Sequence, residues 1–174
     1  MIDKDLLNKL RGSSQKTAVN GYITSAQQPR FLYALSPDGF NTNLGRATEV
    51  SALNADLAAP GSSELFSMNF AFSKDMDQAS VMNTYNWLIS RASLRENGDV
   101  YNVGLTPPKT EAAILPIPVL VSYDTEKNMA TVLFRISQNA DADATIDPAH
   151  IVFKFYGMDA YGKSMDTSAD EYSG

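Results

Sequence analysis

An acidic loop contains the carboxylates of this sequence that are best placed to hold a metal ion. The stretch NADADATID at 139–147 brings Asp141, Asp143 and Asp147 close together, with Asn139 beside them. Alternating carboxylates in a loop can surround a hard cation, and Ca²⁺ takes roughly six to eight oxygen ligands. The loop lacks the glycine and the closing glutamate of an EF-hand. Calcium at these three aspartates is therefore one hypothesis, and a solvated loop with no cofactor is the other.

Side chains for catalysis are sparse. His150 is the one histidine in the chain, so a Ser-His-Asp site would have to use it. The sequence has no Gly-Xaa-Ser-Xaa-Gly elbow, no phosphate-binding glycine loop and no histidine pair for zinc. A lone histidine at the entry to a strand is usually structural or solvent-facing. We therefore expect a protein that is not an enzyme.

A second acidic feature follows the apolar run IVFKFYG at 151–157. It is a turn that begins near Asp159 and contains Gly162. An aspartate can accept backbone N–H groups in a tight turn, and glycine adopts positive φ without steric cost. Both residues are thus explained as the end of a strand, without a ligand.

Aromatic side chains could form a stacking platform for sugars. The candidates are Tyr85, Trp87, Tyr101, Tyr123, Tyr156 and Tyr161. Aromatic residues at alternating strand positions lie more often in a core, and a single tryptophan suits the core of a β-sandwich. Carbohydrate binding stays an alternative function.

Charge and cysteine content exclude other classes. Fourteen Lys and Arg face twenty Asp and Glu, which gives a formal net charge of −6, and the basic residues do not cluster. We therefore expect no nucleic-acid partner. The absence of cysteine excludes disulfides and thiolate metal sites. The most apolar stretch, at 112–121, is ten residues long with two prolines, so we expect no membrane insertion.

The N-terminal residues 2–11 have the pattern of a short amphipathic helix. Leu6 and Leu10 lie on one stripe, with Leu7 beside them. Because so short a helix is marginal alone in water, it either packs on its own domain or docks on a protein partner through Leu6, Leu7 and Leu10. The acidic start, where a signal peptide would be basic, predicts no signal peptide in this chain.

The rest of the sequence predicts short strands separated by turns. Residues 64–72 alternate between apolar and polar, with four side chains expected on one face: Phe66, Met68, Phe70 and Phe72. Tyr85, Trp87 and Ile89 are expected to share a face of another strand. The strands are expected at 30–36, 64–73, 85–93, 114–124, 129–137 and 151–157, with a helical turn within 74–83 and no clear assignment for 48–59.

These strands predict an all-β fold, an antiparallel Ig-like β-sandwich with a short N-terminal helix and an extended arm. Polar, small residues at 12–29 are typical of a linker or arm. We expect residues 1–45 to form the helix and arm, 46–166 the sandwich, and 167–174 a flexible tail.

Three motifs resemble bacterial Ig-like domains of the SbsA type. They are FAFSKDMDQASVMNTYNWLI at 70–89, VSYDTEKNMATVLFRI at 121–136 and IDPAHIVFKFYGMDAYGKSMD at 146–166. The likeness covers about residues 60–166 and leaves 1–45 unmatched. It implies an extracellular or cell-envelope building block that is mostly without enzymatic activity.

The sequence therefore predicts a non-catalytic structural or interaction module of a bacterial surface, secreted or appendage-associated protein, with a protein partner. The alternative is a β-sandwich module that binds a carbohydrate or a peptide. An unpaired strand edge at 114–121 would favour peptide binding by strand addition.

Overall fold

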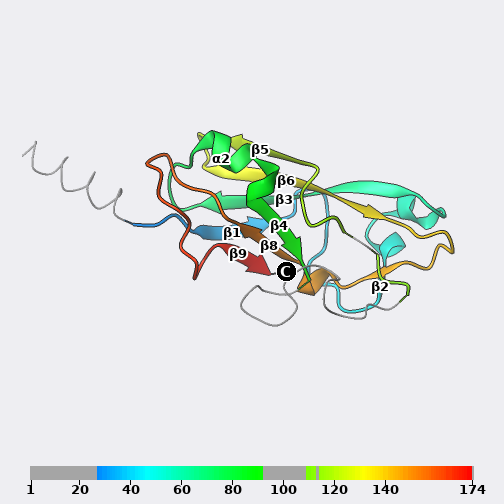
Figure 1. The fold of residues 1–174 in the computed structure, drawn as a ribbon. Coiled ribbons are helices and arrows are strands. Elements are labelled where there is room, and N and C mark those ends of the chain that lie inside the picture. The colour runs from blue at the N-terminus through cyan, green and yellow to red at the C-terminus, as the bar shows by residue number, and fades with distance from the viewer. Residues whose placement is uncertain (1–26, 92–108, 113, 174) are drawn as a thin grey trace, which may run out of the picture.

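The protein is an all-β, sandwich-like fold of antiparallel sheets with very little helix (Figure 1). The computed structural model describes residues 27–91, 109–112 and 114–173. The largest sheet has the strand order β1-β3-β6-β5, and a second sheet has the order β4-β8-β9. A pair of two-residue strands, β2 and β7, forms a small third sheet. The strands are β1 (Phe31–Leu35), β2 (Thr48–Glu49), β3 (Ser63–Phe72), β4 (Trp87–Ser90), β5 (Leu120–Asp124), β6 (Met129–Ser137), β7 (Thr145–Ile146), β8 (Val152–Phe155) and β9 (Glu171–Ser173).

Strands β3 and β6 form the centre of the large sheet. They pair in an unbroken antiparallel register from Ser63 opposite Ser137 to Ala71 opposite Met129. The predicted alternation of β3 is confirmed, because its four apolar side chains at 66, 68, 70 and 72 are all at most 3% exposed. Strand β6 has the predicted bounds and the same two-residue period. Burial of one face of each strand sets this register, since a slip by one residue would turn the apolar side chains outward.

Aromatic rings join the two main sheets. Phe70 of β3 lies 5.3 Å from the ring of Phe153 on β8, and Phe72 lies 5.5 Å from Phe155. The ring of Trp87 on β4 joins the same cluster and lies 4.7 Å from the ring of Phe155. All three ring pairs are tilted, and their centroid distances lie in the range that is favourable for aromatic pairs. The single tryptophan is thus part of the core, as predicted.

The helical segments are short. The helical turn expected within 74–83 is α2, and the segment without a clear assignment at 48–59 contains β2 and two 3₁₀ turns. Asp77 begins α2 by accepting the amide of Ser80 at 2.6 Å, which is the usual role of an N-cap aspartate. The helical segments are η1 (Val50–Ala52), η2 (Ala55–Ala58), α2 (Gln78–Met82), η3 (Thr84–Asn86) and η4 (Pro148–His150).

Both ends of the sandwich extend further than the predicted bounds. Strand β1 pairs with β3, and Phe40 is 1% exposed in the core, so the sandwich includes residues before 46. The tail predicted to be flexible contains β9, which pairs with β8. Lys154 of β8 explains this attachment, because its ammonium lies 3.2 Å from the carboxylate of Asp170 and 3.5 Å from that of Glu171.

Two strands are shorter than predicted. The strand expected at 85–93 begins only at Trp87, and Tyr85 lies in η3 with 79% of its surface exposed rather than on the face of Trp87 and Ile89. The strand expected at 114–124 is paired only from Leu120. Pro116 and Pro118 explain the second difference, because proline has no amide to donate to a sheet.

Several predictions fall outside the described residues: the docking side chains Leu6, Leu7 and Leu10, and Tyr101. Within the part of the chain that the structure describes, no helix is long and apolar enough to cross a membrane.

Candidate functional site

The candidate site lies where β5 departs from β6. Strand β5 pairs with β6 from Asp124 opposite Met129 to Leu120 opposite Leu133, and the amide of Val119 donates to the carbonyl of Leu133 at 2.8 Å. After that point the chain turns away, and the carbonyl of Pro116 accepts the amide of Ile89 instead. The last part of β6 therefore has β3 on one side and, among the described residues, no strand on the other.

The backbone direction at this edge follows from the sheet register. Leu133 bonds toward β5, whereas the amide of Gln138 donates to Ser62 on the side of β3. Successive residues of a strand point their N–H and C=O groups to opposite sides. Arg135 and Ser137 therefore point their backbone groups away from β3, toward the side that β5 has left. An unpaired row of this kind is a template for another strand.

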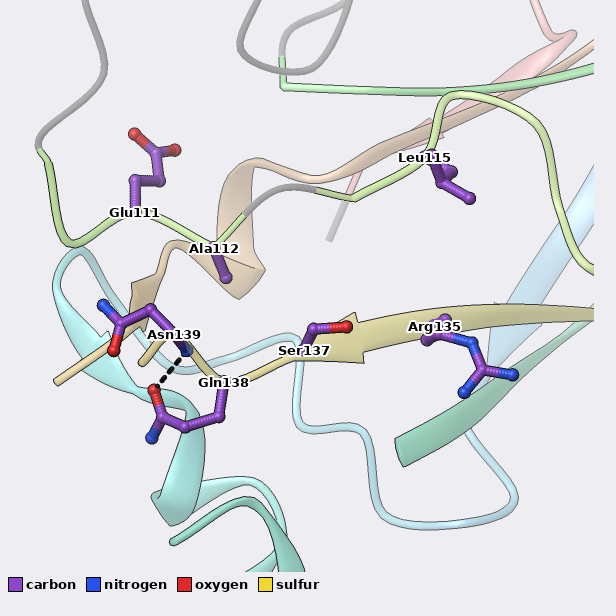
Figure 2. Close-up of a pocket in the computed structure, with 7 residues that line it drawn as sticks. All are labelled: Glu111, Ala112, Leu115, Arg135, Ser137, Gln138 and Asn139. Atoms are coloured by element: carbon purple, nitrogen blue, oxygen red, sulfur yellow. Dashed lines mark hydrogen bonds between the residues drawn. The ribbon is translucent and has the colours of Figure 1, made fainter. Parts of the chain in front are cut away.

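A pocket of about 510 Å³ lies along this edge. One wall is the end of β6 with the residues after it, and the other is the segment that returns toward β5 (Figure 2). This volume is in the range of ligand-binding pockets. We call the pocket the β6 slot, and its lining is Glu111, Ala112, Leu115, Arg135, Ser137, Gln138 and Asn139.

Buried hydrogen bonds hold both walls of the β6 slot. The side chain of Gln138 donates to the carbonyl of Leu57 at 2.9 Å and accepts the amides of Ala144 and Asn139 at 2.8 and 3.0 Å. On the other wall, the amide of Ala112 donates to the carbonyl of Thr145 at 2.7 Å. The walls are thus fixed to the same β7 region, which gives the slot a constant width at this end.

The slot combines an apolar side chain with polar ones. Leu115 is 65% exposed, so its side chain is accessible to a ligand in the slot. Arg135 donates to the hydroxyl of Ser63 at 2.9 Å, so its guanidinium lies over the outer face of the sheet. In Figure 2 the carboxylate of Glu111 points away from β6, and Ala112 points toward Gln138.

Glu111 closes one end of the slot and also lines a smaller pocket of about 120 Å³. Its side chain is 4% exposed, and its carboxylate lies 3.4 Å from the guanidinium of Arg91. Neither carboxylate oxygen accepts a hydrogen bond. Burying a carboxylate in this way costs free energy that only the charge of Arg91 offsets. The position of the Glu111 side chain is therefore set by the surrounding structure rather than by hydrogen bonds to its carboxylate.

The opposite edge of the large sheet is protected. Strand β1 pairs only with the second half of β3, so the first half of β3 has β6 on one side and, among the described residues, no partner strand on the other. There, however, the carboxylate of Asp38 accepts the amide of Ser67 at 2.6 Å and its hydroxyl at 2.8 Å. A side chain that takes up the edge amides discourages pairing with another chain. The β6 edge has no such protection among the described contacts.

The predicted calcium residues do not lie around one point. Asp143 bonds to Asn139, whose side chain donates at 2.6 Å and accepts the Asp143 amide at 3.1 Å. Asp147 is buried, 3.0 Å from Nδ1 of His150 and 3.9 Å from the guanidinium of Arg46. Within the described ranges, no group of three or more acidic or histidine side chains could hold a metal. Calcium at Asp141, Asp143 and Asp147 stays a prediction.

His150 has a structural contact. Its side chain is 64% exposed and meets the buried Asp147 at the start of β8. This matches the interpretation of a structural or solvent-facing histidine at the entry to a strand.

The turn at Asp159 and Gly162 is the end of a strand in this structure. The carboxylate of Asp159 accepts the amides of Tyr161 and Lys163 at 2.9 and 2.8 Å, and its other oxygen lies 2.7 Å from the ammonium of Lys74. Gly162 has φ of 79°, as predicted for the turn. Burial raises the pKa of Asp159, but the bonds from Lys74 and the two amides outweigh it and lower the pKa below its usual value.

Sequence reasoning missed the β6 slot, although one signal was present. It named an unpaired edge at 114–121 as a feature that would favour peptide binding, and β5 (Leu120–Asp124) is an edge strand of the large sheet, but the pocket lies along the end of β6 instead. The prolines at 116 and 118 indicated that a strand there could not pair along its whole length. Nothing local in the alternating pattern of β6 marks Arg135 and Ser137 as the residues beyond the end of the pairing with β5.

Comparison of the chain with protein-family models, with curated proteins and with solved structures found no match in any of the three.

Proposed function

We propose that this protein is a non-catalytic interaction module that receives an extended peptide strand in the β6 slot. The observation that supports this is the backbone of Arg135 and Ser137, which has no partner strand on this side among the described residues, beside a 510 Å³ pocket. A strand added there would bond to the N–H and C=O groups of both residues, which is the usual mode of peptide capture at a sheet edge. Leu115 would contact one of its side chains.

Amide exchange can test this proposal in the intact protein. Random twelve-residue peptides are displayed and selected on the wild-type chain, and the enriched peptides are synthesised. We expect a bound peptide to slow the exchange of the Arg135 and Ser137 amides at least tenfold. The amides of Phe134 and Ile136 serve as an internal reference, because pairing with β3 already protects them.

Two variants test whether the selected peptides bind in the β6 slot. Leu115→Glu introduces a charge into the slot and should abolish enrichment. Leu35→Glu is the matched control, since Leu35 is 44% exposed on β1, at the other edge of the sheet. Peptides that bind both variants equally, or that leave the Arg135 and Ser137 amides unprotected, would contradict the proposal.

A second candidate is carbohydrate binding in the same slot. The polar side chains of Arg135, Ser137 and Asn139 could hydrogen-bond to sugar hydroxyls. A glycan array distinguishes the two functions. A sugar would bind through side chains, so that Asn139→Ala would weaken binding while the amide of Ser137 would keep exchanging.

We also propose that the module belongs to a bacterial surface, secreted or appendage-associated protein. The likeness to SbsA-type Ig-like domains supports this, and two of the motifs that produce it are in contact. The amide of Ala160 donates to the carbonyl of Asp75 at 3.1 Å, and Met76 forms a β-bridge with Asp159. Fractionation of cells that express the natural gene tests this location, and a signal confined to the cytoplasm would contradict it.

A further inference from the structure

The described chain begins at the end of the sandwich that is remote from the β6 slot. The carbonyl of Gln27 accepts the ammonium of Lys74 at 2.9 Å, and Phe31 pairs with Phe72. The slot lies at the other end of the sheet, because Arg135 pairs with Leu65. Seven residue steps of β3 separate Phe72 from Leu65, which corresponds to about 23 Å.

The sequence just before this point contains a run that favours β-pairing. Residues 22–24 are Tyr, Ile and Thr, and all three types are enriched in strands. Three residues are enough to span the backbone groups from Arg135 to Ser137 that have no partner strand in the described part of the chain. The run also offers apolar side chains for the exposed Leu115. These residues lie outside the described part of the chain.

The run cannot reach the slot of its own molecule. Ile23 is four residues before Gln27, so the two are at most about 14 Å apart even in a fully extended chain. The distance along the sheet alone exceeds this. The slot of a second molecule has no such limit, because the two molecules can approach end to end.

We propose that the strand taken up by the β6 slot is the segment Tyr22–Thr24 of a second copy of this chain. This inference rests on the proposed function of the slot. Each copy would donate its run at one end and receive a neighbour's run at the other. Such a contact is heterologous, and a repeated heterologous contact that does not close produces an open chain of subunits. The protein would thus assemble head to tail.

Complementation between two defective variants tests this assembly in the full-length chain. Ile23→Pro removes an amide and favours a backbone that breaks the added strand, but it leaves the slot intact. Leu115→Glu blocks the slot but leaves the donated run intact. We expect wild-type protein to exceed 19.0 kDa in sedimentation velocity, with a mass that grows beyond the dimer as concentration rises. Each variant alone should stay at the monomer mass.

The equimolar mixture of the two variants gives the decisive measurement. One intact slot and one intact run allow a single contact, so the mixture should form a dimer of twice 19.0 kDa and nothing larger. Ser13→Pro and Leu35→Glu are the controls, and both should assemble like the wild type. Circular dichroism melts of all variants show whether each is folded.

Several results would overturn the inference. They are a wild-type chain that stays monomeric up to millimolar concentration, assembly that survives Ile23→Pro, and a mixture that does not dimerise although both variants are folded. Peptide selection separates this failure from that of the proposed function. If selected peptides protect the Arg135 and Ser137 amides while the wild type stays monomeric, the slot binds another protein's strand. If no peptide protects them, both proposals fail.

Discussion

The buried ion pair between Lys74 and Asp159 allows a quantitative test of how the fold is held together. Their side chains are 7% and 0% exposed, and the charged atoms lie 2.7 Å apart. The pair joins the loop after β3 to the turn after β8. Asp159→Asn keeps an oxygen that can accept the amides of Tyr161 and Lys163, but it removes the negative charge. The ammonium of Lys74 then keeps its hydrogen bond to the carbonyl of Gln27 but loses the carboxylate of Asp159 as a partner.

The expected cost follows from burial. Removing one partner of a buried pair destabilises a protein by about 3–5 kcal/mol, and the retained bond to Gln27 favours the lower end, about 3 kcal/mol. For a chain of this length, that corresponds to a fall in melting temperature of about 10 °C. Chemical denaturation followed by tryptophan fluorescence measures the loss in free energy of unfolding, since Trp87 is buried. The control Lys127→Met breaks a largely exposed pair with Asp124 and should leave the unfolding curve almost unchanged.

A double variant checks the cause. If the cost comes from an uncompensated buried ammonium, Lys74→Met combined with Asp159→Asn should recover about half of the lost stability. The reasoning is refuted if Asp159→Asn changes stability by less than about 1 kcal/mol, or if the double variant is less stable than either single one.

The same pair predicts the response to acid. The pKa of Asp159 is lower in the folded protein than its unfolded value of about 3.9. The unfolded state therefore binds the proton more readily, so this group stabilises the fold above its unfolded pKa. That contribution is lost as the pH falls through the folded pKa. Between about pH 5 and pH 2 the wild type should lose stability more steeply than Asp159→Asn. Equal slopes would show that Asp159 does not contribute.

Other predictions concern packing, the C-terminal strand and the acidic loop. Gly157→Ala should destabilise by about 1–3 kcal/mol, because the new methyl group would overlap the buried ring of Phe155, whereas Gly45→Ala has open space and should not destabilise; equal melts would contradict this. A chain ending at Ala169 should melt well below the full chain, since it lacks β9 and the acidic partners of Lys154, and an unchanged melt would mean that the tail contributes nothing. Melts with and without millimolar Ca²⁺ test the calcium prediction: a rise in melting temperature that Asp143→Ala abolishes would establish the site, and an unchanged melt would leave Asp143 as the partner of Asn139.

Local pattern was enough to predict the central strands and part of the core. The period of two in β3 and β6 requires one buried face whatever the neighbours are, so Phe66, Met68, Phe70 and Phe72 could be assigned from the sequence. The turn chemistry of Asp159 and Gly162 was equally local, because an aspartate side chain and a positive φ act within a few residues.

Tertiary structure decided which edges are paired and where the ends of the chain lie. Strand β9 is held by contacts that are distant in sequence, because it pairs with β8 and Glu171 lies near Lys154, seventeen residues away, and no local pattern shows these contacts. Tyr85 is exposed because the chain enters β4 through a 3₁₀ turn rather than an extended strand. The β6 slot depends on the departure of a strand that is distant in sequence from Arg135 and Ser137. Hydrogen bonding between strands is non-local, so the sequence determined the strands themselves, and only the assembled sheets decided which backbone groups were left for a partner.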